Sequence, residues 1–272
     1  MTVWDYDSDA RRRPTLDELE ELLANPGVVL AFVVRDIKIR YRRSFLGALW
    51  SLGGPLLMMI VLSVAFSHAF AAAAPAFPAF VLPGLLLWNF FAATTSAITA
   101  EAASGLELWR RARVPKCATA VATTITGLVH LAIAVIPLIV IEVVFGRPLG
   151  LALIVVPAVM LLAALFTLGF ALIVASVALH FPDAGHLYQI VLSAWMFLTP
   201  VVYPMSILPP KVQNVVAWNP MTIFVGAFRD PLYSADVPST FTFALMAALA
   251  FGTLTLGWFL FTRGTEEAAY RG

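Results

Sequence analysis

The chain has 272 residues, of which 61% are hydrophobic and 12% are charged, and its net charge is only +1. A soluble domain carries about 25% charged residues. With a mean hydropathy of +0.89, the chain is therefore neither a soluble enzyme nor a nucleic-acid-binding domain. The single cysteine, Cys117, excludes an internal disulfide and a zinc site built from cysteines. An integral membrane protein is predicted.

Residues 1–48 are predicted to form short helices at one surface of the membrane, since many charges precede the first long apolar run. Thr15 and Glu18 have the spacing of a capping box, which predicts a helix over residues 16–24. The Asn-Pro-Gly sequence at 25–27 is typical of a helix end.

A second helix in this region is predicted to begin near Val28. Val33, Ile37 and Tyr41 recur at helical spacing, and Asp36 and Arg40 form an i, i+4 pair. The basic residues of this segment are Arg35, Lys38, Arg40, Arg42 and Arg43. The pattern favours an amphipathic helix in the membrane interface, with its basic side toward lipid phosphates. A charged flank with no further role is the alternative.

Six apolar runs follow, at 49–70, 80–100, 117–145, 149–179, 187–204 and 240–262. Each is long enough for a hydrocarbon core of ~30 Å, which takes roughly 20 helical residues. We therefore expect an all-α polytopic protein whose transmembrane domain of six helices covers 49–262. Residues 263–272 would form a cytoplasmic tail.

The segment 101–116, between the second and third runs, is predicted to contain a short amphipathic helix outside the bilayer. Leu106 and Trp109 lie one turn apart, and Arg110 and Arg113 follow at the same spacing. A tryptophan in such a turn favours a docking helix for a cytoplasmic partner over a simple basic anchor.

The segment 204–238 is rich in proline and also apolar, so it is too broken for a transmembrane helix and too apolar for a free loop. Two short helices that dip back into the membrane would satisfy this composition. They must be shielded by protein, because irregular backbone exposed to lipid is not tolerated.

The distribution of lysine and arginine predicts the orientation. Fourteen of the 17 basic residues fall on one side of the predicted helices, and the exceptions are Arg147, Lys211 and Arg229. By the positive-inside rule, both termini are expected in the cytoplasm.

Several chemistries lack their usual residues. No glycine-rich phosphate loop is present, since none of the three lysines follows a glycine. Glu142 is a lone carboxylate near the outer end of the third run, with a structural role or a cargo contact as its alternatives. His130, the one ionisable residue deep in a run, is interpreted as an interhelical hydrogen-bond donor. No catalytic residue and no metal site are predicted.

The run from Arg35 to Trp50, followed by Gly54-Pro55-Leu56, resembles the opening of type-2 ABC exporter permeases that move O-antigen, capsule, teichoic acid or mycobacterial galactan. The resemblance continues through Gly84-Leu85, Trp88, the segment 106–116, Thr199-Pro200-Val201, Tyr203-Pro204, Asn219-Pro220 and Arg229. It departs at Phe181-Pro182-Asp183, where Phe-Arg-Asp is usual.

This resemblance implies a permease subunit in a bacterial inner membrane. Two copies would form the pathway, each with a separate ATPase subunit that binds ATP and Mg, so that this chain binds no cofactor. The coupling helix on the ATPase would contain Leu106, Leu108, Trp109, Arg110, Arg111 and Arg113. The basic residues from Arg35 to Arg43, above all Arg40 and Arg43, would receive the diphosphate of a polyprenyl-linked glycan, since guanidinium groups fit phosphate oxygens.

An aromatic-lined conduit suits a sugar polymer, because the C–H faces of sugars stack on rings. The candidates are Trp50, Trp88, Phe90, Phe91, Trp195, Phe197 and Tyr203. Tryptophan and tyrosine also concentrate at membrane interfaces without such a role. Alanine at Trp88 or Tyr203 is expected to slow export without lowering the amount of protein.

Two other functions stay open from the sequence. One is a permease of the same fold for a drug or a lipid. The other is a membrane-embedded glycosyl or phosphoglycosyl transferase, for which His180, Asp183 and His186 are the candidate residues. The sequence names neither the sugar nor the lipid anchor.

Overall fold

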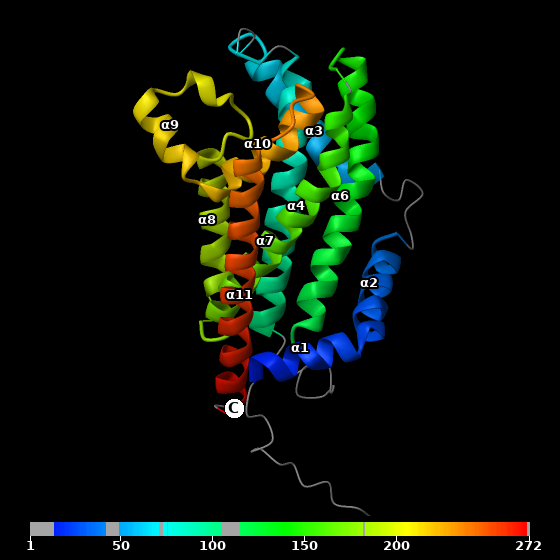
Figure 1. Ribbon diagram of the computed structural model, residues 1–272, viewed down its shortest axis with the longest axis vertical. Coiled ribbons are helices and arrows are strands. Elements are labelled where there is room, and N and C mark those ends of the chain that lie inside the picture. The colour runs from blue at the N-terminus through cyan, green and yellow to red at the C-terminus, as the bar shows by residue number, and fades with distance from the viewer. Residues whose placement is uncertain are drawn as a thin grey trace, which may run out of the picture.

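The computed structural model describes residues 14–41, 49–70, 73–74, 76–104, 115–148, 150–181 and 183–270, and every regular element in these ranges is helical (Figure 1). The α-helices are α1 (Pro14–Ala24), α2 (Pro26–Tyr41), α3 (Leu49–Phe66), α4 (Phe77–Ser104), α6 (Ala118–Val144), α7 (Val156–Ala178), α8 (Ala184–Leu198), α9 (Pro210–Ala217), α10 (Pro220–Tyr233) and α11 (Thr240–Tyr270). Two 3-10 turns, η1 (Leu151–Val155) and η2 (Met205–Ile207), complete the order.

Four helical stretches in the described ranges are long and apolar enough to cross a membrane: Phe77–Ala103, Ala118–Val144, Leu151–Ala178 and Thr240–Thr265. Two shorter apolar helices, Gly53–Phe66 and Ala184–Leu198, account for the first and fifth predicted runs. The class of polytopic helical membrane protein is confirmed, while the count of six transmembrane helices stays a prediction.

The tightest helix pair in the bundle is α7 with α11, which cross at two glycines. A Cβ atom added at Gly257 would overlap the carbonyl oxygen of Gly169, and one added at Gly169 would overlap the backbone at Thr253 and Leu254. Small residues let membrane helices approach closely, which compensates for the missing hydrophobic driving force between helices in lipid. The two backbones are therefore in direct contact.

An aromatic core joins α4, α7, α8 and α10. The ring of Phe91 lies 5.4 Å from Trp195 and 6.0 Å from Phe166, and Phe166 stacks on Phe224 at 4.7 Å. Such ring pairs contribute roughly 0.5–1.5 kcal/mol beyond their buried area. The middle of the bundle is thus filled by side chains.

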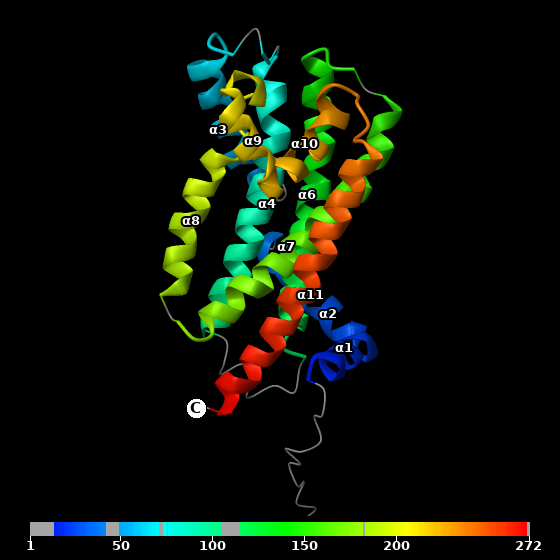
Figure 2. The same cartoon turned by 60° about the vertical axis from the view of Figure 1, so that its left-hand side comes forward.

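Both described N-terminal helices lie at one end of the bundle, which we call the terminal end because the last turns of α11 also lie there (Figures 1 and 2). α1 crosses the foot of the bundle, and the indole Nε1 of Trp258 on α11 donates to the carbonyl oxygen of Thr15 at 3.0 Å. α2 packs against α6 and buries Val33. Pro26 begins α2 because proline fits the first turn of a helix, so Asn25 alone separates α1 from α2.

At the opposite end, the segment 204–238 contains α9 and α10. α10 packs against α4 and α7 and buries most of its apolar residues, whereas α9 buries only Val216 among its eight residues. Protein therefore shields α10, as the sequence requires of a re-entrant helix. The depth of these helices in a membrane stays a prediction.

Candidate functional site

The buried side chain of Arg229 fixes the middle of α10. Its Nη2 donates to the carbonyl oxygen of Val201 at 2.8 Å, and its guanidinium carbon lies 3.9 Å from the centre of the Phe80 ring. Gly84 makes this possible, because a Cβ there would overlap Nη2 and lie 3.1 Å from the Val201 oxygen. A buried cation is stable only with such partners, here a carbonyl dipole and a ring face.

Asn219 fixes the beginning of α10. Its Oδ1 caps the helix by accepting from the backbone N–H of Met221 at 3.0 Å, and also accepts from the indole N–H of Trp195 at 2.9 Å. Its Nδ2 donates to the hydroxyl of Thr199 at 2.8 Å. One side chain thus ties the start of α10 to the last turn of α8.

Arg147 fixes the end of α10. Its Nε donates to the carbonyl oxygen of Tyr233 at 2.7 Å, and its guanidinium carbon lies 3.8 Å from the centre of the Tyr233 ring. The nearby Glu142 is fully buried, and its carboxylate oxygens have no hydrogen-bond partner within the part of the chain that the structure describes. Arg147 and Arg229 are two of the three basic residues that lie apart from the predicted cytoplasmic side. Their contacts show that both stabilise the end of the bundle that contains α10.

Four motif positions far apart in the sequence meet around α10. They are Gly84, Val201, Asn219 and Arg229, and we call them the α10 clamp. The sequence marked Arg229 as an exception in charge and, like Gly84, as part of a resemblance, and no spacing rule joined the two. The usable signal was an arginine inside an apolar, proline-rich segment, which requires a buried partner.

At the terminal end, two hydrogen bonds hold the start of α6. The carboxylate of Glu18 accepts from the backbone N–H of Cys117 at 2.9 Å, and both residues are buried. Lys116 donates to the hydroxyl of Thr265 at 3.3 Å. Glu18 was expected within a capping box of its own helix, but α1 begins at Pro14, so Thr15 lies inside the helix. The actual bond of Glu18 spans 99 residues.

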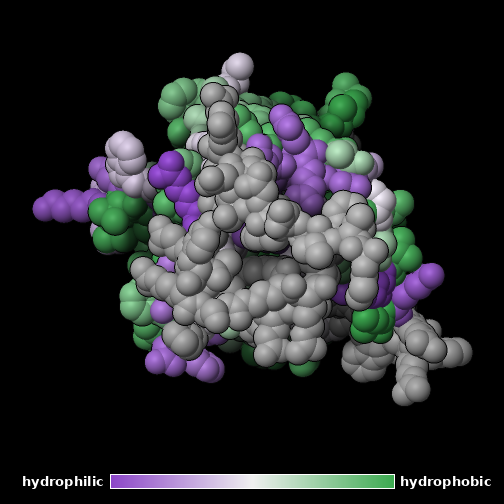
Figure 3. Space-filling model, turned by 90° about the horizontal axis from the view of Figure 1, so that it is seen from below, coloured by the Kyte–Doolittle hydropathy of each residue, from purple (hydrophilic) through white to green (hydrophobic). Residues whose placement is uncertain are grey.

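The predicted coupling residues Leu106, Leu108, Trp109, Arg110, Arg111 and Arg113 lie outside the described residues, as does Pro182. The flanking residues 104 and 115 belong to α4 and to the turn before α6, at the terminal end. Figure 3 looks at this end and shows hydrophilic side chains around its rim. The described residues on both sides of the predicted docking segment therefore lie at the terminal end.

Two of the five residues predicted for the diphosphate have described side chains, and both are exposed. Arg35 forms an ion pair with Asp36 at 2.9 Å and covers the ring of Phe32 at 4.7 Å. Lys38 lies one turn farther along α2. The side chain of Arg40, and residues Arg42 and Arg43, lie outside the described part, so the predicted pair of Asp36 with Arg40 stays a prediction.

Six of the seven predicted channel aromatics have described side chains, and these fall into three environments. Trp88, Phe91 and Trp195 belong to the aromatic core, with Trp88 only 3% exposed. Phe197 is exposed, and its carbonyl oxygen accepts from the Tyr203 hydroxyl at 3.0 Å. Phe90 borders a cavity between α4 and α6, and the Trp50 side chain lies outside the description. Their place in a channel remains a prediction.

Of the candidate transferase residues, His180 and Asp183 lie at the turn between α7 and α8, and His186 lies in the first turn of α8. His180 Nδ1 is 3.0 Å from the carbonyl oxygen of Ser176, and Asp183 precedes α8. Among the described residues, no three His, Cys, Asp or Glu side chains form a group that could hold a metal ion.

Comparison with known proteins assigns the family. A model of the ABC-2 type transporter family matches residues 28–233, from α2 to the end of α10. The chain belongs to the ABC-2 type transporter family. As a family member it is a transport component, and the matched region contains the whole α10 clamp.

Relatives resemble the chain over nearly its full length. It is 27% identical over 253 residues to the O-antigen export system permease protein RfbA of Myxococcus xanthus, covering 92% of this chain and 97% of the relative. It is 29% identical over 230 residues to the capsule polysaccharide export inner-membrane protein CtrC of Neisseria meningitidis serogroup B, covering 80% and 83%. The polysialic acid transport protein KpsM of Escherichia coli is 24% identical over 246 residues, covering 88% and 94%.

Proposed function

We propose that the chain is the permease subunit of an ATP-driven exporter, which moves a polyprenyl-diphosphate-linked polysaccharide from the cytoplasmic to the outer face of a bacterial inner membrane. This proposal rests on the relatives named for O-antigen, capsule and polysialic acid transport, because the chain matches each of them over most of its own length and of theirs. The family match extends over the same elements.

The terminal end is the proposed cytoplasmic face, with the segment 105–114 on an ATPase subunit. Closure of the ATPase would push this segment, and the bond from Glu18 to Cys117 would pass the displacement to α1. The bond from Trp258 to Thr15 would pass it on to α11. ATP and Mg would be bound by the partner subunit, and this chain would supply the mechanical coupling.

The pathway is proposed to run between two copies of the chain. Side chains fill the centre of the described bundle, where Phe91, Phe166 and Phe224 are each at most 2% exposed. α3 and α8 instead present exposed apolar side chains, among them Val64 at 79% and Ile190 at 68%. Two copies joined through such faces would leave a conduit between them.

The test is to deplete the protein in its host and quantify lipid-linked glycans in the cytoplasmic leaflet. Accumulation of one polyprenyl-diphosphate glycan is expected, because synthesis continues while export stops. Unchanged pools would contradict the proposal and favour the alternative cargo, a drug or a lipid. Loss of the glycan would contradict it in favour of a synthetic enzyme.

The stoichiometry has its own test, because the family match does not fix it. Purification of the tagged chain with its ATPase subunit is expected to give two copies of each, measured as the mass of the complex. Alanine at Trp109 is expected to release the ATPase subunit, and alanine at the exposed Lys211, at the opposite end, is not. Retention of the ATPase by the Trp109 variant would contradict the assigned coupling helix.

A further inference from the structure

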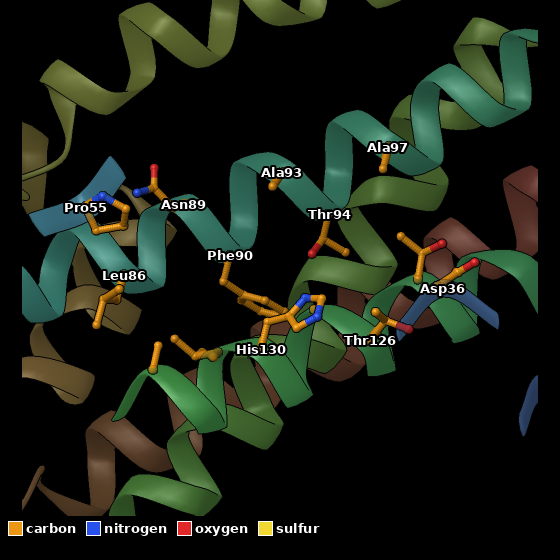
Figure 4. Close-up of a pocket in the computed structure, with 14 residues that line it drawn as sticks. Asp36, Pro55, Leu86, Asn89, Phe90, Ala93, Thr94, Ala97, Thr126 and His130 are labelled. Atoms are coloured by element: carbon orange, nitrogen blue, oxygen red, sulfur yellow. The ribbon is translucent and has the colours of Figure 1, made fainter. Parts of the chain in front are cut away.

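A cavity of about 350 Å³ lies between α2, α4 and α6 and is bordered by Pro55 of α3 (Figure 4). This volume falls at the lower end of the range of ligand pockets, roughly 300–1,000 Å³. Figure 4 shows Asp36 and Thr126 toward one end and Pro55 toward the other. Because α4 runs away from the opposite end and α6 runs toward it, the Asp36 side is the one nearer the terminal end.

The lining combines neutral hydrogen-bonding groups with one ring face. Its polar members on α4 and α6 are Asn89, Thr94, Thr123, Thr126 and His130. Phe90 supplies an aromatic wall, and Figure 4 shows the His130 ring near it. The described lining contains no lysine or arginine, and its one carboxylate is Asp36. This chemistry suits an uncharged group with many hydroxyls and disfavours a phosphate.

Small residues keep the space open. Ala93 and Ala97 lie on α4 one turn apart and are both exposed, so the cavity can be reached from outside the bundle. Gly127 on α6 lets the two helices approach, since a Cβ there would lie 2.6 Å from the Thr94 hydroxyl and 3.0 Å from the Phe90 ring. The cavity therefore persists beside a close helix crossing.

The hydroxyl of Thr126 lacks a hydrogen-bond partner in the described protein. The residue itself is 8% exposed. Two residues earlier on the same helix, the Thr124 hydroxyl donates to the carbonyl oxygen of Ala120 at 2.9 Å. A buried hydroxyl without a partner is costly, more so in a membrane, so rotation of the Thr126 side chain toward the cavity that it lines would give the hydroxyl a hydrogen bond to a ligand.

We propose that this cavity binds the sugar residue adjacent to the diphosphate of the lipid-linked glycan, an inference that rests on the proposed function. α2 connects the two parts of such a substrate. Its Asp36 borders the cavity and pairs with Arg35, while the exposed Arg35 and Lys38 on the same helix have further N–H groups for phosphate oxygens. The sugar is held by hydroxyl contacts and by the face of Phe90, and the diphosphate stays outside.

Photo-crosslinking in the complete transporter identifies the occupant. Benzoylphenylalanine replaces Ala97 in the cavity or Ile136, a residue of α6 that is 66% exposed and outside the lining. The host's own lipid-linked glycan is the probe. Irradiation is expected to attach glycan at position 97 and only phospholipid at position 136. Phospholipid alone at position 97, or no adduct there while the transporter exports glycan, would overturn the proposal.

A matched pair of substitutions gives a second measurement without added bulk. Thr126→Val removes the hydroxyl in the cavity, and Thr124→Val removes one that is bonded within its helix. Export is expected to fall about fivefold to tenfold in Thr126→Val, the loss of one hydrogen bond to substrate, and to stay unchanged in Thr124→Val. Thermal stability separates this from misfolding, because replacing an unsatisfied hydroxyl by a methyl group does not destabilise the protein.

Wild-type export by the Thr126→Val variant would overturn the assignment of the cavity. The export function would still hold if depletion of the protein causes glycan to accumulate. Unchanged glycan pools on depletion would instead contradict the export function itself. The two failures are therefore distinguishable.

Discussion

The carboxylate of Glu18 accepts a hydrogen bond from the backbone N–H of Cys117, and this 2.9 Å contact joins the first described helix to the start of α6. It lies three residues after the segment 105–114, on which an ATPase subunit is proposed to act. A carboxylate at a helix N-terminus is favoured by the helix dipole and by the free N–H groups there. α1 therefore holds the start of α6 in place at the proposed coupling face.

Glu18→Ala is expected to expose Cys117 to thiol reagents. A hydrogen bond to a charged group contributes about 1.5–3 kcal/mol, so labelling of this single cysteine by a maleimide should accelerate about tenfold or more. The measurement is the labelling rate of the purified protein in detergent. Glu20→Ala, at an exposed position of the same helix, serves as control. Equal rates in both variants would show that α1 does not protect the start of α6.

Arg229→Ala is expected to release α10. The carbonyl oxygen of Val201 would lose its buried donor, which costs roughly 1–3 kcal/mol, and Phe80 would lose its cation. Limited proteolysis between α8 and α10 should accelerate in this variant. Lys211→Ala, at the exposed start of α9, should digest like the wild type. An unchanged digestion rate for Arg229→Ala would rule out the clamp as the element that holds α10.

Gly257→Ala is expected to lower thermal stability in detergent because the added methyl group would overlap the backbone of Gly169. Gly252→Ala on the same helix meets nothing within 4 Å and is expected to be neutral, or to gain about 0.5–1 kcal/mol from the better helix former. If both variants melted alike, α7 and α11 would not be in backbone contact in the membrane protein.

Trp88→Ala and Tyr203→Ala are now expected to differ. Trp88 is 3% exposed within the aromatic core, so truncating it should cost about 3–5 kcal/mol and reduce the yield of folded protein. Tyr203 is only partly buried, and its loss should leave the yield unchanged. Quantifying membrane-inserted protein together with export separates the two. Normal yield with slowed export in Trp88→Ala would restore this residue as a channel candidate.

The sequence predicted those parts of the fold that follow from local patterns. Apolar runs of sufficient length predicted the long helices, and the proline-rich composition of 204–238 indicated two short helices. Protein shields α10, whereas α9 is largely exposed. The helix end expected at 25–27 was wrong in one respect, since Pro26 and Gly27 begin α2. A proline is compatible with both a helix end and a first turn, and a single sequence does not decide between them.

The contacts between distant elements could not be predicted. Glu18 carried a local capping signal, yet its carboxylate accepts a hydrogen bond from a residue 99 positions away. Trp88 and Phe91 looked like interface aromatics because the sequence shows a ring but not its neighbours, and packing against Trp195 places both in the core. The neutral lining between α4 and α6 arises from alanine, threonine and glycine, which carry no motif of their own.

The α10 clamp also bears on how the chain is made. The partners of Arg229, namely Phe80, Gly84 and Val201, all precede it in the sequence, and the Asn219 side chain bonds back to Trp195 and Thr199. Because synthesis proceeds from the N-terminus, the receiving surface has left the ribosome before the buried arginine emerges. Arg229 can therefore move directly from water to its partners, without waiting in lipid as an isolated charge.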